Sequence, residues 1–372
     1  MIRPLVLCFL FHAGLWAQIA LDPAKGAQAF HALEPLAGEE MMACSVDAIR
    51  PAISYSFKMQ AGFVMSVPVR PYAGKSHVWA VLLRVTPDAN ESKPLYLGSN
   101  FRVPKMPASR DSLAFSGVFL VGEGDFTVDF VSVDDTSKVC RKTWHVKAKL
   151  NKDEQRMKGL LPPNTAQALY FAPKRAADST PAKNRVTILL HAAPAFPRST
   201  QLRGRDRARL LGSLASLLEQ LPDTAVRLVA FNLDQQREIY RTNTFNGDSF
   251  EKLAEALQQL DLGVVDIRTL NNRKGHIDML SDLIDSETSS APDAVIFLGP
   301  TARNTGKVPA EKSSDAPRFF YFQFKLMRER PGPPDAIESA TKALGGKVIS
   351  IHTPTEYARA IDQLEKYLAR GR

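Results

Sequence analysis

Cysteine is scarce in this chain, and long apolar runs are absent beyond its N-terminus. Only three of the 372 residues are cysteine. The N-terminal apolar run, residues 5–15, is shorter than the about 20 residues that a membrane-spanning helix needs. It follows Arg3 and precedes Ala17, as in a secretory signal peptide that is cleaved near Ala17. We therefore predict a signal peptide over residues 1–17 and export to the periplasm or the extracellular space. An uncleaved anchor is the alternative.

The positions of the cysteines indicate a disulfide bond. Cys8 lies within the predicted signal peptide, so its removal leaves Cys44 and Cys140. Disulfides persist in the compartments that exported proteins reach. Cys44 precedes the first β-type run of the N-terminal region and Cys140 lies at the last. These strands are neighbours in many sandwich folds. We predict a Cys44–Cys140 disulfide, with two buried free thiols as the alternative.

The sequence lacks the motifs of the common catalytic sites. It has no Gly-x-Ser-x-Gly elbow, no Gly-x-x-x-x-Gly-Lys phosphate loop, no Gly-x-Gly-x-x-Gly after a strand and no His-Glu-x-x-His helix. These absences argue against acyl-enzyme, nucleotide, dinucleotide and zinc-protease chemistry. The sequence therefore predicts a protein that is not an enzyme and holds no cofactor.

The net charge of +9 is concentrated in one segment. Between Arg141 and Arg185 there are 11 Lys and Arg against 3 Asp and Glu. Such a segment can contact anionic lipid, polysaccharide or an acidic protein, although most such runs are simply solvated. Aromatic residues do not interleave these charges, so we do not expect an exported chain of this kind to bind nucleic acid.

Short β-type runs separated by turn residues occupy the N-terminal region. Seven runs, the first at 53–59 and the last at 143–148, predict an antiparallel β-sandwich of the immunoglobulin-like type over residues 44–150. Residues 151–184 are rich in proline and charge. They are predicted to form a basic linker with a short helix around 165–170.

Residues 185–372 alternate between strand and helix patterns. The run at 294–298 is apolar throughout and that at 186–190 is apolar except for Thr187, as expected of strands that helices cover on both faces. Leucines at helical spacing over 207–221 predict a helix that packs through one face. The short connections predict a doubly wound, mostly parallel α/β sheet with an antiparallel edge hairpin at 231–241.

The order of these elements resembles the von Willebrand factor type A-like domain. The resemblance runs from Asn184 to the C-terminus, about half of the chain, and depends on the strand at 186–190, the helix at 207–221, the strand pair at 226–241 and the segment 294–300. In that family an Asp-x-Ser-x-Ser loop after the first strand, a Thr from a later loop and an Asp after the fourth strand hold a metal ion. Such oxygen ligands suit a hard cation like magnesium.

The matching positions carry no such oxygen ligands. His191, Ala193, Ala195 and Pro300 occupy them. The resemblance therefore implies a degenerate metal site and the loss of metal-dependent adhesion. The alternative is a zinc site at His191 and His276, for which a third protein ligand would still be required.

Basic residues around the same sheet edge are the positive feature of this region. Ligands of doubly wound sheets bind at the carboxyl ends of the strands, and the basic residues expected there are Arg198, Arg203, Arg205, Lys274 and Arg303. Our hypothesis is that these fixed cations replace the metal ion and receive an acidic side chain or an anionic glycan. A solvated rim is the alternative.

The sequence as a whole predicts an exported, two-domain, non-catalytic interaction protein. Its α/β domain, residues 185–372, would bind a protein or acidic glycan partner without a metal ion. One alternative is an enzyme that uses the crevice between the strands ending at Leu190 and Leu298. Another is an assembly subunit whose sandwich donates or accepts an edge strand. The sequence does not indicate the oligomeric state.

Overall fold

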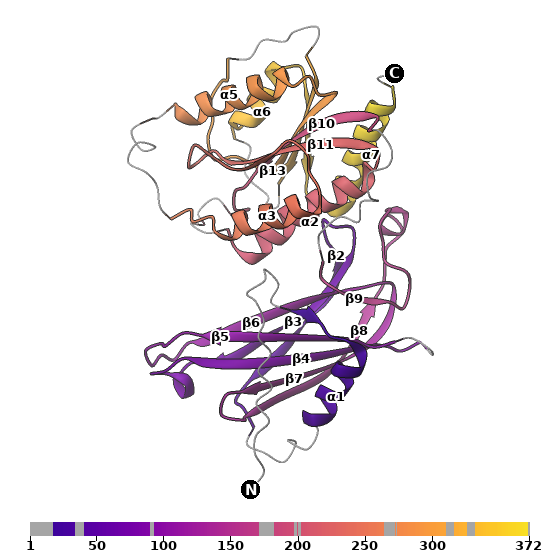
Figure 1. Cartoon of the computed structure of the whole chain (residues 1–372), viewed down its shortest axis with the longest axis vertical. Coiled ribbons are helices and arrows are strands. Elements are labelled where there is room, and N and C mark those ends of the chain that lie inside the picture. Colours follow the sequence, from indigo (N-terminus) through magenta and orange to yellow (C-terminus); the bar gives the residue numbers. More distant parts are fainter. Residues whose placement is uncertain are drawn as a thin grey trace. The chain divides into compact units, whose positions relative to one another are not determined.

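The computed structural model divides the chain into two compact units (Figure 1). The β unit comprises Met1–Ala52, Met59–Lys149 and Leu161–Leu169, and the α/β unit comprises Ile53–Lys58, Leu150–Leu160 and Tyr170–Arg372. The predicted signal peptide and Arg198 lie outside the described residues. The structure describes residues 18–33, 41–89, 93–170, 182–196, 199, 202–263, 272, 274–309, 316–325 and 332–370.

Two sheets that contain antiparallel strand pairs form the β unit. The five-stranded sheet has the order β1-β5-β4-β7-β8, and the four-stranded sheet has the order β2-β3-β6-β9. The strands of the first are β1 (Ile19–Ala20), β4 (His77–Pro87), β5 (Leu95–Val103), β7 (Gly124–Asp134) and β8 (Val139–Ala148). Those of the second are β2 (Ser45–Ile53), β3 (Met59–Pro68), β6 (Ser112–Val121) and β9 (Ala166–Ala168).

Aromatic side chains fill the space between the two sheets. The ring of Phe63 on β3 lies 4.9 Å from the ring of Phe130 on β7. The ring of Trp79 on β4 lies 5.3 Å from that of Phe115 on β6. Each pair joins one sheet to the other, so the two sheets pack face to face on an aromatic core.

The predicted disulfide between Cys44 and Cys140 is confirmed. Their Cα atoms lie 6.2 Å apart. Cys44 immediately precedes β2 and Cys140 lies on β8, which are edge strands of different sheets. The bond therefore connects the edges of the two sheets.

Two local predictions for the β-rich region are wrong. Residues 54–58, expected within the first strand, form a turn between β2 and β3 in which the Ser54 amide donates to the Lys58 carbonyl over 3.1 Å. The helix expected at 165–170 is replaced by β9, which pairs with the end of β6. Pairing with β6 gives the backbone groups of β9 the hydrogen-bond partners that a short helix would have provided within itself.

The structure contains a helix near the N-terminus, α1 (Pro23–Leu33), that the sequence patterns above do not predict. The Asp22 carboxylate accepts hydrogen bonds from the amides of Ala24 and Lys25 at 3.1 and 3.3 Å. Asp before a helix and Pro in its first turn are helix-start signals. Phe30 of this helix packs on Tyr96 of β5, with ring centroids 5.8 Å apart.

The α/β unit is built on a six-stranded sheet with the order β12-β11-β10-β13-β14-β15. Neighbouring strands are parallel except for the antiparallel edge pair β11–β12. This mostly parallel sheet with an antiparallel edge strand agrees with the prediction. The strands are β10 (Asn184–His191), β11 (Thr224–Asn232), β12 (Arg237–Thr242), β13 (Ala294–Pro300), β14 (Arg318–Phe324) and β15 (Lys347–Ile351).

Helices cover both faces of this sheet (Figure 1). On one face, Leu280 of α5 and Ile337 of α6 share an apolar cluster with Phe297 of β13. On the other, the ring of Tyr357 on α7 lies 6.0 Å from that of Phe322 on β14. None of the described helices is long and apolar enough to cross a membrane. The helices are α2 (Gly204–Gln220), α3 (Gly247–Gln258), α5 (Gly275–Ser289), α6 (Ala336–Ala343) and α7 (Pro354–Arg370).

Two segments that precede the sheet in sequence belong to the α/β unit, namely 53–58 and 150–160. Phe57 has a left-handed backbone, with φ of 58°, and its buried ring lies 5.6 Å from that of Tyr357. The Ser216 hydroxyl on α2 donates to the Tyr55 carbonyl over 2.7 Å. The expected boundaries of the sandwich (44–150), the linker (151–184) and the α/β domain (185–372) stay predictions.

Candidate functional site

The carboxyl ends of β10 and β13 lie side by side at the centre of the α/β sheet. β10 pairs with β11 on one side and with β13 on the other, and β13 in turn pairs with β14. The chain therefore leaves these two strands in opposite directions, which is where doubly wound sheets bind ligands. We call residues 191–196, which end and follow β10, and residues 299–305, which end and follow β13, the crest.

His191 is buried in the crest, with 1% of its surface exposed. Its Nδ1 atom lies 3.1 Å from the carbonyl oxygen of Pro300, and its ring centroid lies 5.4 Å from that of Phe231. A carbonyl oxygen only accepts, so Nδ1 carries the proton. Burial lowers the pKa of His191 below 6.5, although the bond to Pro300 acts in the opposite direction. The ring is therefore neutral at neutral pH, and its Nε2 atom has no hydrogen-bond partner among the described residues.

The carbonyl of Pro300 also belongs to a buried network. The Tyr321 hydroxyl lies 3.1 Å from that carbonyl and 3.2 Å from Oδ2 of Asp335. The same Oδ2 atom accepts hydrogen bonds from the Gln323 side chain at 2.9 Å and from the Ala302 amide at 3.0 Å. Burial, together with the Asp335 carboxylate, raises the pKa of Tyr321 well above its usual value. These groups bond to one another, so their arrangement anchors the crest.

Gly299 allows the end of β13 to lie directly against His191. Its φ of +154° lies in the region that favours glycine. A Cβ atom added there would stand 2.6 Å from the His191 carbonyl oxygen and 2.9 Å from the His191 Cβ. The approach therefore requires glycine, and the two halves of the crest touch through their backbones.

The positions matched to the family's metal ligands all lie in the crest. Ala193 is buried, and the Ala195 amide lies 3.4 Å from Oδ1 of Asp206. Pro300 offers only a carbonyl, which His191 and Tyr321 already approach. Within the part of the chain that the structure describes, no group of three or more His, Cys, Asp or Glu side chains could hold a metal ion. Metal-independent binding stays a prediction.

The two histidines considered as a zinc pair contact different carbonyl groups. His191 contacts Pro300 through Nδ1, whereas Nε2 of His276 lies 3.2 Å from the Thr305 carbonyl. Each of these nitrogen atoms carries its proton when it donates to a carbonyl, and a metal would need it free. The zinc alternative would have to use the other nitrogen of each ring.

The predicted basic residues differ in how much of their charge is available. Nε of Arg303 lies 3.5 Å from Oδ2 of Asp234, and its Nη2 donates to the Ser199 carbonyl over 3.0 Å. Arg203 and Lys274 are exposed at the starts of α2 and α5, and neither pairs with a carboxylate among the described residues. Arg303 is therefore largely neutralised, and the predicted set does not act as one uniform cluster.

Phe196 is a surface feature that the sequence analysis missed. It is 40% exposed, and the guanidinium carbon of Arg205 lies 4.7 Å from its ring centroid. Phe196 is the first large side chain after β10, beyond three alanines and a proline, and this context could have identified it. Exposed aromatic and arginine side chains are enriched at protein interfaces. We call Phe196, Arg203 and Arg205 the crest rim.

Comparison with known proteins gives no assignment. No family model matches the chain, and no curated protein matches it. A superoxide reductase (neelaredoxin) from Ignicoccus hospitalis has 13% identity and a TM-score of 0.20, covering 31% of this chain and 88% of that one. The putative ApaA protein from Bordetella pertussis has 7% identity and a TM-score of 0.21, covering 30% and 98%. A calcium binding mutant of Bacteroides uniformis beta-glucuronidase 2 has 9% identity and a TM-score of 0.20, covering 88% and 38%. Similarity at this level identifies neither a fold nor a function for this chain.

Proposed function

We propose that this chain is an exported, non-catalytic interaction protein. In this proposal the α/β unit is a von Willebrand factor type A-like domain that binds without a metal ion, and the β unit is an immunoglobulin-like sandwich. The partner is a protein or an acidic glycan, and the crest rim contacts it.

One observation carries the proposal, namely the contrast between the crest and its rim. Within the crest, the buried Pro300 carbonyl is approached by Nδ1 of His191 and by the hydroxyl of Tyr321 from β14. On the rim, Phe196 and Arg205 are exposed, and the Arg205 guanidinium lies over the Phe196 ring. An enzyme needs ionisable groups that converge in an open crevice, whereas an interface needs exposed aromatic and arginine side chains. The contrast therefore favours binding over the enzyme alternative.

The disulfide supports the exported location in this proposal. Cys44 and Cys140 are bonded to each other. Such bonds persist in oxidising compartments and are rare in the cytosol of mesophiles. A partner at the cell envelope or outside the cell is consistent with this chemistry.

The test is capture of the partner from the native envelope fraction by the immobilised mature protein. Capture would be compared with and without a chelator and at low and high salt. We expect a captured component that is unaffected by the chelator and reduced by salt. Phe196→Ala and the double substitution Arg203→Ala with Arg205→Ala should abolish its capture, whereas Lys252→Ala, at an exposed position on α3, should not.

Two outcomes would contradict the proposal. Capture that depends on a divalent cation would indicate that the partner is bound through a metal ion. Capture that survives the rim substitutions unchanged would remove the crest rim as the binding surface.

A further inference from the structure

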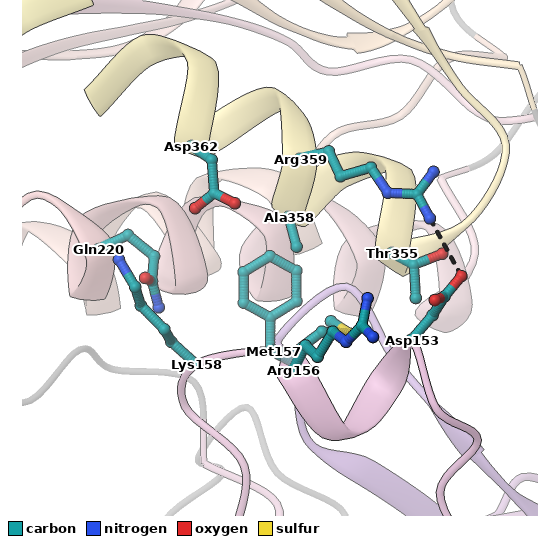
Figure 2. A pocket seen from close by; sticks show the side chains of 10 residues that line it. Asp153, Arg156, Met157, Lys158, Gln220, Thr355, Ala358, Arg359 and Asp362 are labelled. Atoms are coloured by element: carbon teal, nitrogen blue, oxygen red, sulfur yellow. Dashed lines mark hydrogen bonds and ion pairs between the residues drawn. The ribbon is translucent and has the colours of Figure 1, made fainter. Parts of the chain in front are cut away.

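A pocket away from the crest lies within the α/β unit (Figure 2). Its walls come from α2, α7, the turn at 54–58 and the segment 150–160. Its volume is about 240 Å³. This lies below the roughly 300–1,000 Å³ of pockets that hold drug-sized ligands. The pocket therefore suits a single small metabolite.

One part of the pocket lining is apolar. It consists of Phe57, Met157 and Ala358. Phe57 is only 2% exposed, and the ring of Tyr357, 5.6 Å away, fixes its orientation. An apolar surface of this kind favours an aliphatic or aromatic group over a polar one.

The charged lining includes two cations that are already paired. Nη2 of Arg359 lies 3.1 Å from Oδ2 of Asp153, a pair that Figure 2 shows at one side of the pocket. Nζ of Lys158 lies 3.1 Å from Oε2 of Glu365. The first pair neutralises Arg359 of α7, and the second neutralises Lys158 of the segment 150–160.

Two further charges, on Arg156 and Asp362, have no side-chain partner among the described residues. Arg156 ends the short 3₁₀ helix η3 (Glu154–Arg156), whereas Asp362 lies on α7. Figure 2 shows the two side chains on opposite sides of the pocket. A free guanidinium and a free carboxylate beside an apolar surface complement a molecule that carries a carboxylate, an ammonium group and an apolar side chain.

We propose that this pocket binds a free amino acid with an apolar side chain. The ligand carboxylate accepts paired hydrogen bonds from Arg156, and the ligand ammonium donates to Asp362. The apolar side chain packs against the half-buried Ala358, beside the nearly buried Phe57 and Met157. This site is separate from the crest, and the proposal does not depend on the proposed function.

The test is calorimetric titration of the mature protein with L-leucine and with two analogues that each lack one charge. Isocaproate lacks the ammonium group, and leucinamide lacks the carboxylate. L-leucine should bind saturably. Each analogue should bind about ten- to a hundredfold more weakly, because it loses one charge-assisted hydrogen-bonded contact.

Variants assign each charge to its residue. Arg156→Gln should weaken L-leucine by a similar factor and leave leucinamide binding unchanged, because leucinamide has no carboxylate to lose. Asp362→Asn should weaken L-leucine and leave isocaproate binding unchanged. The matched controls Lys152→Gln and Asp282→Asn change exposed charges that do not line the pocket, and they should leave L-leucine binding unchanged.

Three results would overturn the proposal. The first is the absence of saturable L-leucine binding. The second is binding of both analogues as tightly as L-leucine, which would show that the pocket does not recognise the ammonium and carboxylate groups of the ligand. The third is equal weakening by the pocket and control variants, which would indicate a general charge effect.

Discussion

The Nδ1 atom of His191 lies 3.1 Å from the carbonyl oxygen of Pro300, so a buried hydrogen bond joins the ends of two neighbouring strands. Burial lowers the pKa of His191 in the folded chain below 6.5. Between the folded and unfolded pKa values the unfolded chain binds more protons, so the free energy of unfolding rises with pH. The stability that neutral His191 provides is therefore present above about pH 6.5 and is lost as the pH falls through the folded pKa.

Below pH 6.5, we expect His191 to contribute up to about 1.4 kcal/mol per pH unit to the slope of the free energy of unfolding against pH. His191→Gln should remove that part of the slope, because glutamine does not titrate. The measurement is denaturant unfolding over a series of pH values. His145→Gln, at an exposed position, serves as the control. A slope that His191→Gln leaves intact would assign the acid sensitivity to another group.

Gly299→Ala should destabilise the α/β unit by at least about 2 kcal/mol. The substitution combines an unfavourable φ of +154° with a Cβ placed 2.6 Å from the His191 carbonyl oxygen. Gly247→Ala is the control, because a Cβ at that helical position meets no atom within 4 Å. Denaturant unfolding of the two variants should separate them clearly. Equal stability of the two would show that the strand ends can move apart at little cost.

Replacement of Cys44 and Cys140 by serine should lower the free energy of unfolding by about 2–5 kcal/mol. The bond joins residues separated by 96 positions, so its loss gives the unfolded chain much more freedom. A reducing agent should lower the stability of the mature wild-type protein by a similar amount. It should not affect the double serine variant, and a further loss there would mean that reduction acts elsewhere.

Composition and periodicity were sufficient to predict the central strands of the α/β unit. The run 294–298 is apolar in every position and the run 186–190 in every position but Thr187, and only a strand covered on both faces buries such a run completely. The short strand β9 could not be predicted in this way. Its backbone pairs with Phe119–Val121 of β6, a contact between residues far apart in sequence that no local pattern encodes.

The position of the crest could be predicted from the sequence, but its hydrogen-bond network could not. Its location follows from the strand order, whereas the network around Pro300 depends on Tyr321 and Asp335 from later elements. These residues share no motif spacing with His191, since they are brought together only by the pairing of β14 with β13 and the packing of α6 on the sheet. Phe196 is not predicted as an exposed residue for a different reason, because a single aromatic residue after a strand is most often part of a core.

Phe57→Ala should destabilise the α/β unit by about 3–5 kcal/mol, as expected for the loss of a buried phenylalanine. Phe57 lies far before the α/β sheet in sequence, yet its ring packs 5.6 Å from that of Tyr357. The measurement is denaturant unfolding followed by a signal specific to the α/β unit, with Tyr170→Ala as the control because Tyr170 is exposed. Loss of stability only in Phe57→Ala would show that the α/β unit requires residues from outside 185–372. Equal stability of the two variants would instead support an α/β domain that begins at the predicted boundary.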